Sequence, residues 1–139
     1  MSIRNTLIAL SLLVSASAWA GDDSLYRALG EKAGIARLMS DFSGRLKRDE
    51  RIGTFFKETN PKALAEQLTD QVCVLSGGPC KYEGATMKNS HADLGIAKKD
   101  FNILVEVLQQ SMDDANIPFT TQNRLLALLA PMHRDIVTR

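Results

Sequence analysis

Apolar residues recur along this chain at spacings of three and four, the period of one face of an α-helix. Three segments show the pattern clearly, and none shows the alternation of apolar and polar positions that indicates a strand. The stripes are Ile35, Leu38, Met39, Phe42 and Leu46; Phe101, Leu104, Val105, Leu108 and Met112; and Leu125, Leu128, Leu129, Met132 and Ile136. The pattern predicts three amphipathic helices and an all-α fold.

Capping and breaking residues predict the remaining elements. Asn60 and Pro61 are typical of a helix start, and Gly77 is well placed to end that helix, so we expect it to run from Pro61 to about Ser76. The stretch DDSLYRALG indicates a short opening helix stopped at its glycine.

Proline and glycine also predict interruptions. Pro118 separates the last two long stripes, and Pro131 should kink the final helix. The segment from Pro79 to Ser90 is polar and broken by glycine, so we expect a mostly non-helical loop that leads into His91.

The first twenty residues have the features of an export signal. Arg4 precedes the apolar stretch TLIALSLLV, which is too short to span a bilayer, and ASAWA ends in a small-x-small pattern. We expect cleavage after Ala20, which leaves one domain over residues 21–139 in the periplasm or outside the cell. An uncleaved membrane anchor is the alternative.

Charge and hydropathy limit the partners. The chain has 17 Lys and Arg against 16 Asp and Glu, a net charge of +1, and Arg4 is the only charge in the first twenty residues. The mature chain is thus neutral and lacks the basic surface that nucleic acid requires. It also has no second apolar segment that would span a membrane.

Both cysteines lie in CVLSGGPC, at Cys73 and Cys80. An oxidising compartment favours a disulfide between them, and the Gly-Gly-Pro turn makes closure plausible. Two free thiols or a metal-binding pair are the alternatives.

The chain has two histidines, His91 and His133. His91 lies in MKNSHADLGI, among apolar neighbours that suit either a buried structural histidine or a ligand to a flat apolar cofactor. We expect His133 on the surface near the end of the last helix, with a role as a second ligand as the alternative.

The order of these elements and several motifs resemble the group I truncated haemoglobins, small globins with a two-over-two helical sandwich around haem. The matching stretches are LYRALGEKAGI, the DF pair at Asp41 and Phe42, IGTFF, GGPCKYEG, MKNSHADLGI and LLALLAPM. The resemblance covers nearly the whole mature chain and implies a single truncated globin domain that holds haem b and its iron. The chain has no C-x-x-C-H motif for covalent attachment, so we expect the haem to be bound non-covalently.

On this resemblance His91 is the proximal iron ligand, and Phe56 is the aromatic residue that packs flat against the haem. Met87, one helical turn before His91, should lie on the same side of the porphyrin. The full set of expected haem contacts is Phe42, Phe56, Leu64, Leu68, Met87, His91, Ile96, Leu104, Leu125 and Leu129.

The opposite, distal side departs from the family pattern. Group I members commonly have a tyrosine where this chain has Ser43, and one or two glutamines where it has Leu64 and Leu68. Gln71 lies about 20° from Leu64 around the helix and would supply an amide donor if it faces inward. The alternative is that Gln71 and Gln67 are both solvated. The expected distal pocket is Ser43, Leu64, Leu68 and Gln71.

The resemblance implies reversible binding of a diatomic gas, namely oxygen, nitric oxide or carbon monoxide, in a non-enzymatic, oxygen-binding or transport-like role. Ser43 is a poorer donor to bound oxygen than tyrosine, so we expect lower oxygen affinity than in tyrosine-bearing relatives. The alternatives are a nitric oxide dioxygenase or peroxidase-like enzyme, which would need an unidentified electron donor or a distal acid–base group, and a helical interaction module without haem.

Overall fold

The computed structural model describes residues 21–139, and within this range it contains helices and connecting turns but no strand. The helices are α1 (Ser24–Ala28), α2 (Glu31–Arg48), the 3-10 turn η1 (Gly53–Phe56), α3 (Pro61–Leu75), α4 (Met87–His91), α5 (Lys98–Asp114), α6 (Phe119–Leu129), the 3-10 turn η2 (Ala130–Met132) and α7 (His133–Ile136). The all-α expectation is confirmed. The expected export signal and its cleavage site fall outside the described residues.

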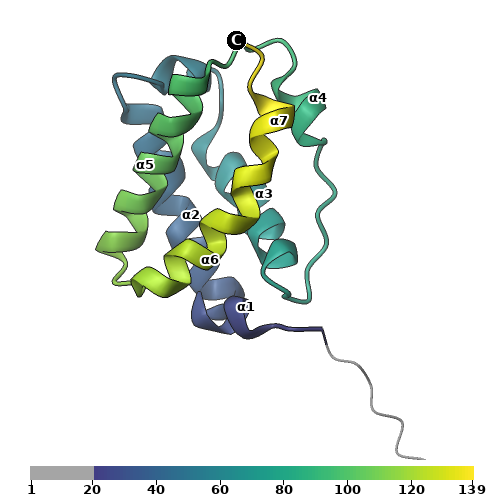
Figure 1. The fold of residues 1–139 in the computed structure, drawn as a ribbon. Helices are drawn as coiled ribbons and strands as arrows, with labels where there is room; N and C mark the ends of the chain where they lie inside the picture. The colour runs from purple at the N-terminus through teal and green to yellow at the C-terminus, as the bar shows by residue number, and fades with distance from the viewer. Residues whose placement is uncertain (1–20) are drawn as a thin grey trace, which may run out of the picture.

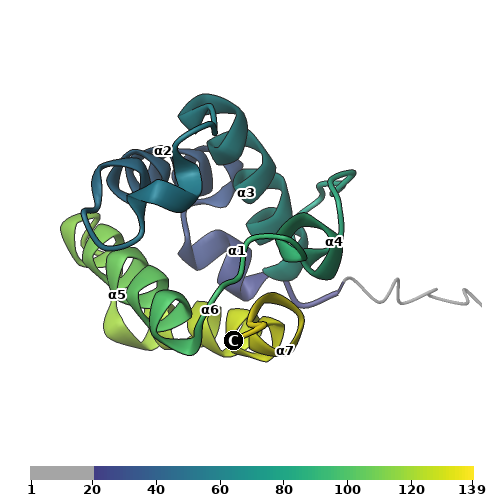
Figure 2. The ribbon, with the colours of Figure 1, turned by 90° about the horizontal axis from the view of Figure 1, so that it is seen from above.

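Two groups of helices face each other (Figure 1 and Figure 2). In the view from above, α2 and α3 lie together on one side, α5, α6 and α7 lie on the other, and α4 stands at one edge. Helix α2 packs against both α3 and α5, while α4 packs against α7. The apolar stripes meet between the two groups, where the most deeply buried large side chains are Ile35, Met39, Leu46, Ile52, Leu108, Met112 and Leu125.

Helix α3 has the ends that its sequence predicts. The Asn60 side chain accepts hydrogen bonds from the amides of Lys62 and Ala63, at 2.9 and 3.2 Å. At the other end Gly77 has φ of +91°, and the amides of Gly77 and Gly78 donate to carbonyls of the last turn. Only glycine adopts this left-handed backbone without strain, which is why the helix ends there.

The last apolar stripe is interrupted more strongly than a single kinked helix would be. Because Pro131 lacks an amide donor, α6 ends at Leu129, and a 3-10 turn separates it from α7. Leu128 was expected on the buried stripe, but this expectation is wrong, since the side chain is 37% exposed.

The expected loop from Pro79 to Ser90 is also partly wrong. Its first part is non-helical, but Met87 to Ser90 belong to α4, where the Thr86 side chain accepts a hydrogen bond from the free amide of Asn89. His91 therefore closes a short helix rather than following a loop.

Cys73 and Cys80 form a disulfide, with Cα atoms 5.9 Å apart. This excludes the free thiols and the metal pair. The bond ties the buried end of α3 to the segment that leads to α4. Among residues 21–139, no helix has the length and apolar character needed to cross a membrane.

Candidate functional site

A largely apolar cavity lies where η1, α4, α5 and the C-terminal residues meet. Side chains from four separate stretches of the chain surround it. They are Ile52, Phe55, Phe56, His91, Leu94, Ile96, Asp100, Phe101, Leu104 and Ile136. Apart from Asp100, the wall consists of three aromatic rings, one imidazole and aliphatic side chains, which suit a flat apolar ligand that has one metal-coordinating centre.

His91 enters this cavity with its ring fixed by hydrogen bonds at Nδ1. This nitrogen is 2.8 Å from the backbone oxygen of Met87, one turn earlier on α4, and 2.9 Å from the Ser90 hydroxyl oxygen. A carbonyl oxygen only accepts, so Nδ1 carries the hydrogen and Nε2 of the neutral ring keeps its lone pair. Metal-ligating histidines are commonly oriented in this way, because the bond at one nitrogen fixes the tautomer of the other.

The second histidine lies beside the same cavity. The ring of His133 meets the edge of Phe101 with centroids 5.1 Å apart, and its Nε2 is buried without a hydrogen-bond partner. The surface position expected for His133 is therefore wrong. The ring is partly buried because the chain bends at η2 and brings the start of α7 towards α5.

Backbone contacts hold the aliphatic part of the cavity wall. The amides of Thr138 and Arg139 both donate to the carbonyl of Ile96, at 2.9 and 3.2 Å. The carboxylate of Asp100 accepts from the amide of Ala97 at 2.9 Å, which fixes the start of α5. The segment between α4 and α5 is thus held by the C-terminal residues at Ile96 and by the first turn of α5 at Ala97.

The aromatic segment η1 is held by ion pairs. Arg51 pairs with Asp49 at 2.9 Å and with Glu106 of α5 at 3.0 Å. Hydrogen bonds from Arg51 lower the pKa of the Asp49 carboxyl, and the two acidic partners raise the pKa of Arg51. These contacts join the turn before Phe55 and Phe56 to α5.

Several of the expected distal residues are buried beside the core. Ser43 is 1% exposed, and its hydroxyl has no hydrogen-bond partner. This differs from the buried Thr69 and Ser76, whose hydroxyls each donate to a backbone carbonyl at 2.6 Å. Leu64 and Leu68 are half-buried against the core. The Ser43 hydroxyl thus differs from these two in having no partner, and its expected place in a distal pocket stays a prediction.

Gln71 is buried, at 8% exposure, whereas Gln67 on the same helix is exposed. The amide Nε2 of Gln71 is directed at two methionine sulfurs, at 3.3 Å from Met87 and 3.8 Å from Met132. The side chain thus faces inward, towards α4 and η2. Its expected role as a donor to a distal ligand stays a prediction.

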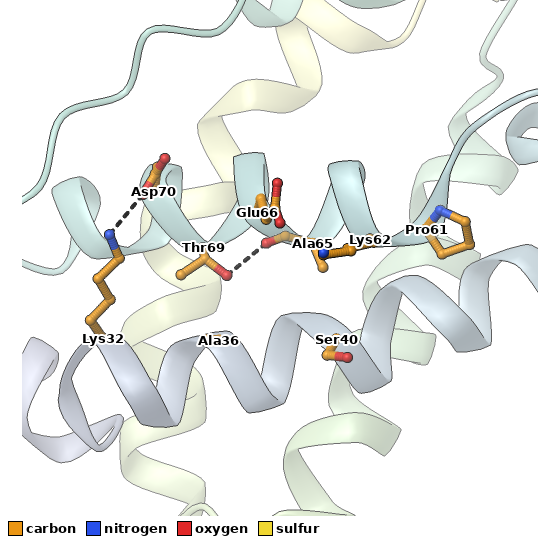
Figure 3. A pocket seen from close by; sticks show the side chains of 9 residues that line it. All are labelled: Lys32, Ala36, Ser40, Pro61, Lys62, Ala65, Glu66, Thr69 and Asp70. Carbon is orange, nitrogen blue, oxygen red and sulfur yellow. Dashed lines mark hydrogen bonds and ion pairs between the residues drawn. The ribbon is translucent and has the colours of Figure 1, made fainter.

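A second hollow, of about 580 Å³, runs along the outside of α2 and α3 (Figure 3). Small side chains line part of it, and its charged residues are of both signs, with Lys32 and Asp70 paired across it at 3.5 Å. Its lining residues are Lys32, Ala36, Ser40, Pro61, Lys62, Ala65, Glu66, Thr69 and Asp70. It contains no imidazole or aromatic side chain, so the cavity at His91 is the candidate site.

Of the residues predicted to contact a cofactor, the structure brings four together at this cavity: Phe56, His91, Ile96 and Leu104. Phe42 and Leu125 lie in the core, and Leu129 packs against it. Sequence reasoning missed Ile52, Phe55, Leu94, Phe101, Asp100 and Ile136 as lining residues. Phe55 and Leu94 could have been predicted from the sequence, because they lie in the motifs IGTFF and MKNSHADLGI together with Phe56 and His91.

Comparison with known proteins agrees with this arrangement. The family model for bacterial-like globins matches residues 24–138. The group 1 truncated hemoglobin GlbN of Mycolicibacterium paratuberculosis is 29% identical over 115 residues, which cover 83% of this chain and 85% of that protein. The GlbN protein of Synechocystis is 27% identical over 125 residues, which cover 84% and 98% respectively.

Solved structures show the same fold. The truncated hemoglobin of Tetrahymena pyriformis, in its Fe(III) form, superposes with a TM-score of 0.78 at 23% identity and covers 83% of this chain and 98% of its own. The 2/2 hemoglobin of Synechococcus, solved in the cyanomet state with covalently attached heme, gives a TM-score of 0.77 at 23% identity, with the same coverage of both chains. The expected two-over-two helical sandwich is confirmed.

Proposed function

Because this chain belongs to the bacterial-like globin family, and within it to the group I truncated haemoglobins, we propose that it binds haem b non-covalently through His91 and reversibly binds oxygen or another diatomic gas. Haem iron, when bound, supplies the coordination position for the gas. The observation that carries the proposal is the His91 ring in the aromatic cavity, with Nδ1 bonded to the Met87 carbonyl at 2.8 Å and Nε2 left as the donor to a metal.

The side chains around His91 match a porphyrin in chemical character rather than in the present size of the cavity, which is about 80 Å³. Phe55, Phe56 and Phe101 provide apolar faces and edges for a flat ring, and the aliphatic residues exclude water from it. On the expected distal side, Ser43 has a short buried hydroxyl without a partner, and Leu64 and Leu68 have no polar atoms to donate. We infer that the distal side holds oxygen weakly.

The distal residues favour gas binding over catalysis. Nitric oxide dioxygenation requires oxygen to be held firmly until nitric oxide arrives, and peroxidase chemistry requires a distal acid–base group. Ser43 and the two leucines provide neither. High turnover with nitric oxide or peroxide, at rates near those of dedicated enzymes, would favour the enzymatic alternative.

Optical spectra of haem-saturated wild type and His91→Gly test the proposal. The wild type should give a Soret band and a ferrous state that binds carbon monoxide and oxygen. His91→Gly should lose the histidine-ligated spectrum and regain it on addition of free imidazole. An unchanged spectrum in His91→Gly would overturn the assignment.

The mode of attachment needs its own test, because the Synechococcus relative has covalently attached heme. We propose non-covalent binding here, so acidified butanone should extract all the pigment. Pigment that stays with the polypeptide would contradict this, and the buried, unpartnered Nε2 of His133 would then be the first atom to examine.

We also propose that the protein acts outside the cytoplasm, after removal of residues 1–20. The sequence of the first twenty residues and the disulfide between Cys73 and Cys80 support this. Fractionation of cells followed by mass spectrometry should find an exported chain that begins at Gly21. A full-length chain in the cytoplasm would refute it.

A further inference from the structure

Gln71 is a polar side chain at a position where the packing would suit an apolar one. It lies on the inner face of α3 and is 8% exposed. An amide taken out of water costs free energy unless it is hydrogen-bonded, and a methionine of similar length would avoid that cost. The partners of the amide therefore indicate what the glutamine does.

Both of its contacts are with thioether sulfurs. The Nε2 atom is 3.3 Å from Sδ of Met87, at the start of α4, and 3.8 Å from Sδ of Met132, at the end of η2. A glutamine amide has two hydrogens to donate, and here one is available for each sulfur. One side chain thus joins α3 to α4 at the edge of the fold and to η2 in the facing group of helices.

Apart from its packing against α7, helix α4 has few other anchors. It has five residues, none of them buried, and a helix of that length is not stable on its own. Its cap comes from the neighbouring Thr86, which belongs to the same exposed segment. The contact with Gln71 instead comes from α3, a helix of 15 residues with five of them buried.

Met87 also helps to orient His91, because its carbonyl accepts the hydrogen bond from Nδ1 at 2.8 Å, beside the Ser90 hydroxyl at 2.9 Å. A side chain held in place at Met87 fixes the backbone of the same residue. The imidazole then keeps one orientation and a constant hydrogen bond, and both affect its strength as a metal ligand.

We propose that Gln71 is a positioning residue for the proximal ligand, and that it acts on His91 through Met87. This inference rests on the proposed function, in which His91 holds the haem iron. It assigns the Gln71 amide to the proximal side of the haem, in place of the distal role that the sequence suggested.

The test compares Gln71→Met with Gln67→Met in the haem-saturated protein. Methionine keeps the length of the side chain and removes the donor, and Gln67 is an exposed glutamine on the same helix. Resonance Raman spectra of the ferrous protein should show a shifted or broadened iron–histidine stretching band in Gln71→Met only. Loss of haem to an excess of apoglobin acceptor should be about threefold faster, as expected for one weak hydrogen bond.

A second variant, Met87→Leu, removes the acceptor. It should reproduce the change in the band, and adding Gln71→Met to it should change nothing further, because the two residues act in series. Thermal unfolding of each variant tests for a merely structural role. Such a role would lower the midpoint of unfolding without shifting the iron–histidine stretching band.

An unmoved band in Gln71→Met, or fully additive effects in the double variant, would overturn the inference. Failure of the proposed function looks different, because the wild type itself would then bind no haem or show no iron–histidine band.

Discussion

The disulfide between Cys73 and Cys80 gives a prediction about stability that follows from its place in the chain. The two cysteines are separated by seven positions, so the bond closes a short loop at the end of α3. Cross-linking removes conformations from the unfolded chain, and for a loop of about eight residues the chain-entropy relation gives about 2.5 kcal/mol at 25 °C. For a domain of this size that corresponds to about 10 °C in Tm.

The substitution that isolates this effect is Cys80→Ser. Cys73 is fully buried, at 0% exposure, and as a thiol it still fills its place in the core, whereas Cys80 is only partly buried. The variant therefore opens the loop without emptying a core position. Because Cys73 is inaccessible in the folded protein, the variant should not form disulfide-linked dimers.

Urea unfolding at fixed haem and protein concentration measures the loss, since ligand binding contributes its own stabilisation. The wild type with reductant should match Cys80→Ser without it, and reductant should not affect the variant further. A loss below about 0.5 kcal/mol in both would refute the loop-closure reasoning. A loss in the variant alone would instead show that serine is not tolerated at this position.

Three further predictions follow from single side chains. Ser43→Tyr should slow oxygen dissociation by about 10- to 100-fold, because a phenol would donate where the short hydroxyl does not; Ser43→Phe is the control of equal bulk, and equal rates in the two variants would refute the distal assignment. Asp49→Asn should destabilise the protein at neutral pH but not at acid pH, because Arg51 lowers the pKa of Asp49 in the folded state. The ionised Asp49 carboxylate therefore stabilises the fold above its unfolded-state pKa, and this stabilisation is lost as the pH falls through its folded-state pKa. Urea midpoints at pH 7 and pH 3 check this, and an equal difference at both would contradict it. Asn60→Ala should cost about 1 kcal/mol by removing the cap of α3, and circular dichroism melts that match the wild type would count against that role.

The long helices were predictable because each buries one face, and burial repeats with the helical period. The ends of α3 were predictable too, since Asn60, Pro61 and Gly77 act through local backbone chemistry. Helix α4 was not, because five residues with none buried give no periodic signal. Pro131 indicated an interruption, but not that α6 would end at Leu129 and be followed by a separate 3-10 turn.

The site was predictable in part for a similar reason. His91 and Phe56 were found through motifs, which are local in sequence. The position of His133 depends on the bend at η2, and the contacts of Gln71 depend on sulfurs 16 and 61 residues away along the chain. A helical projection gave the inward direction of Gln71, but no local pattern encodes such distant partners.

The small number of contacts that hold α4 has a consequence for how haem is exchanged. A segment with so little buried surface opens at a small fraction of the free energy needed to unfold the paired helices around Ile35 and Leu108. Haem should therefore enter and leave by local opening of this corner while the rest of the protein stays folded. Core substitutions would then shorten the lifetime of the folded polypeptide without altering the rate at which haem exchanges.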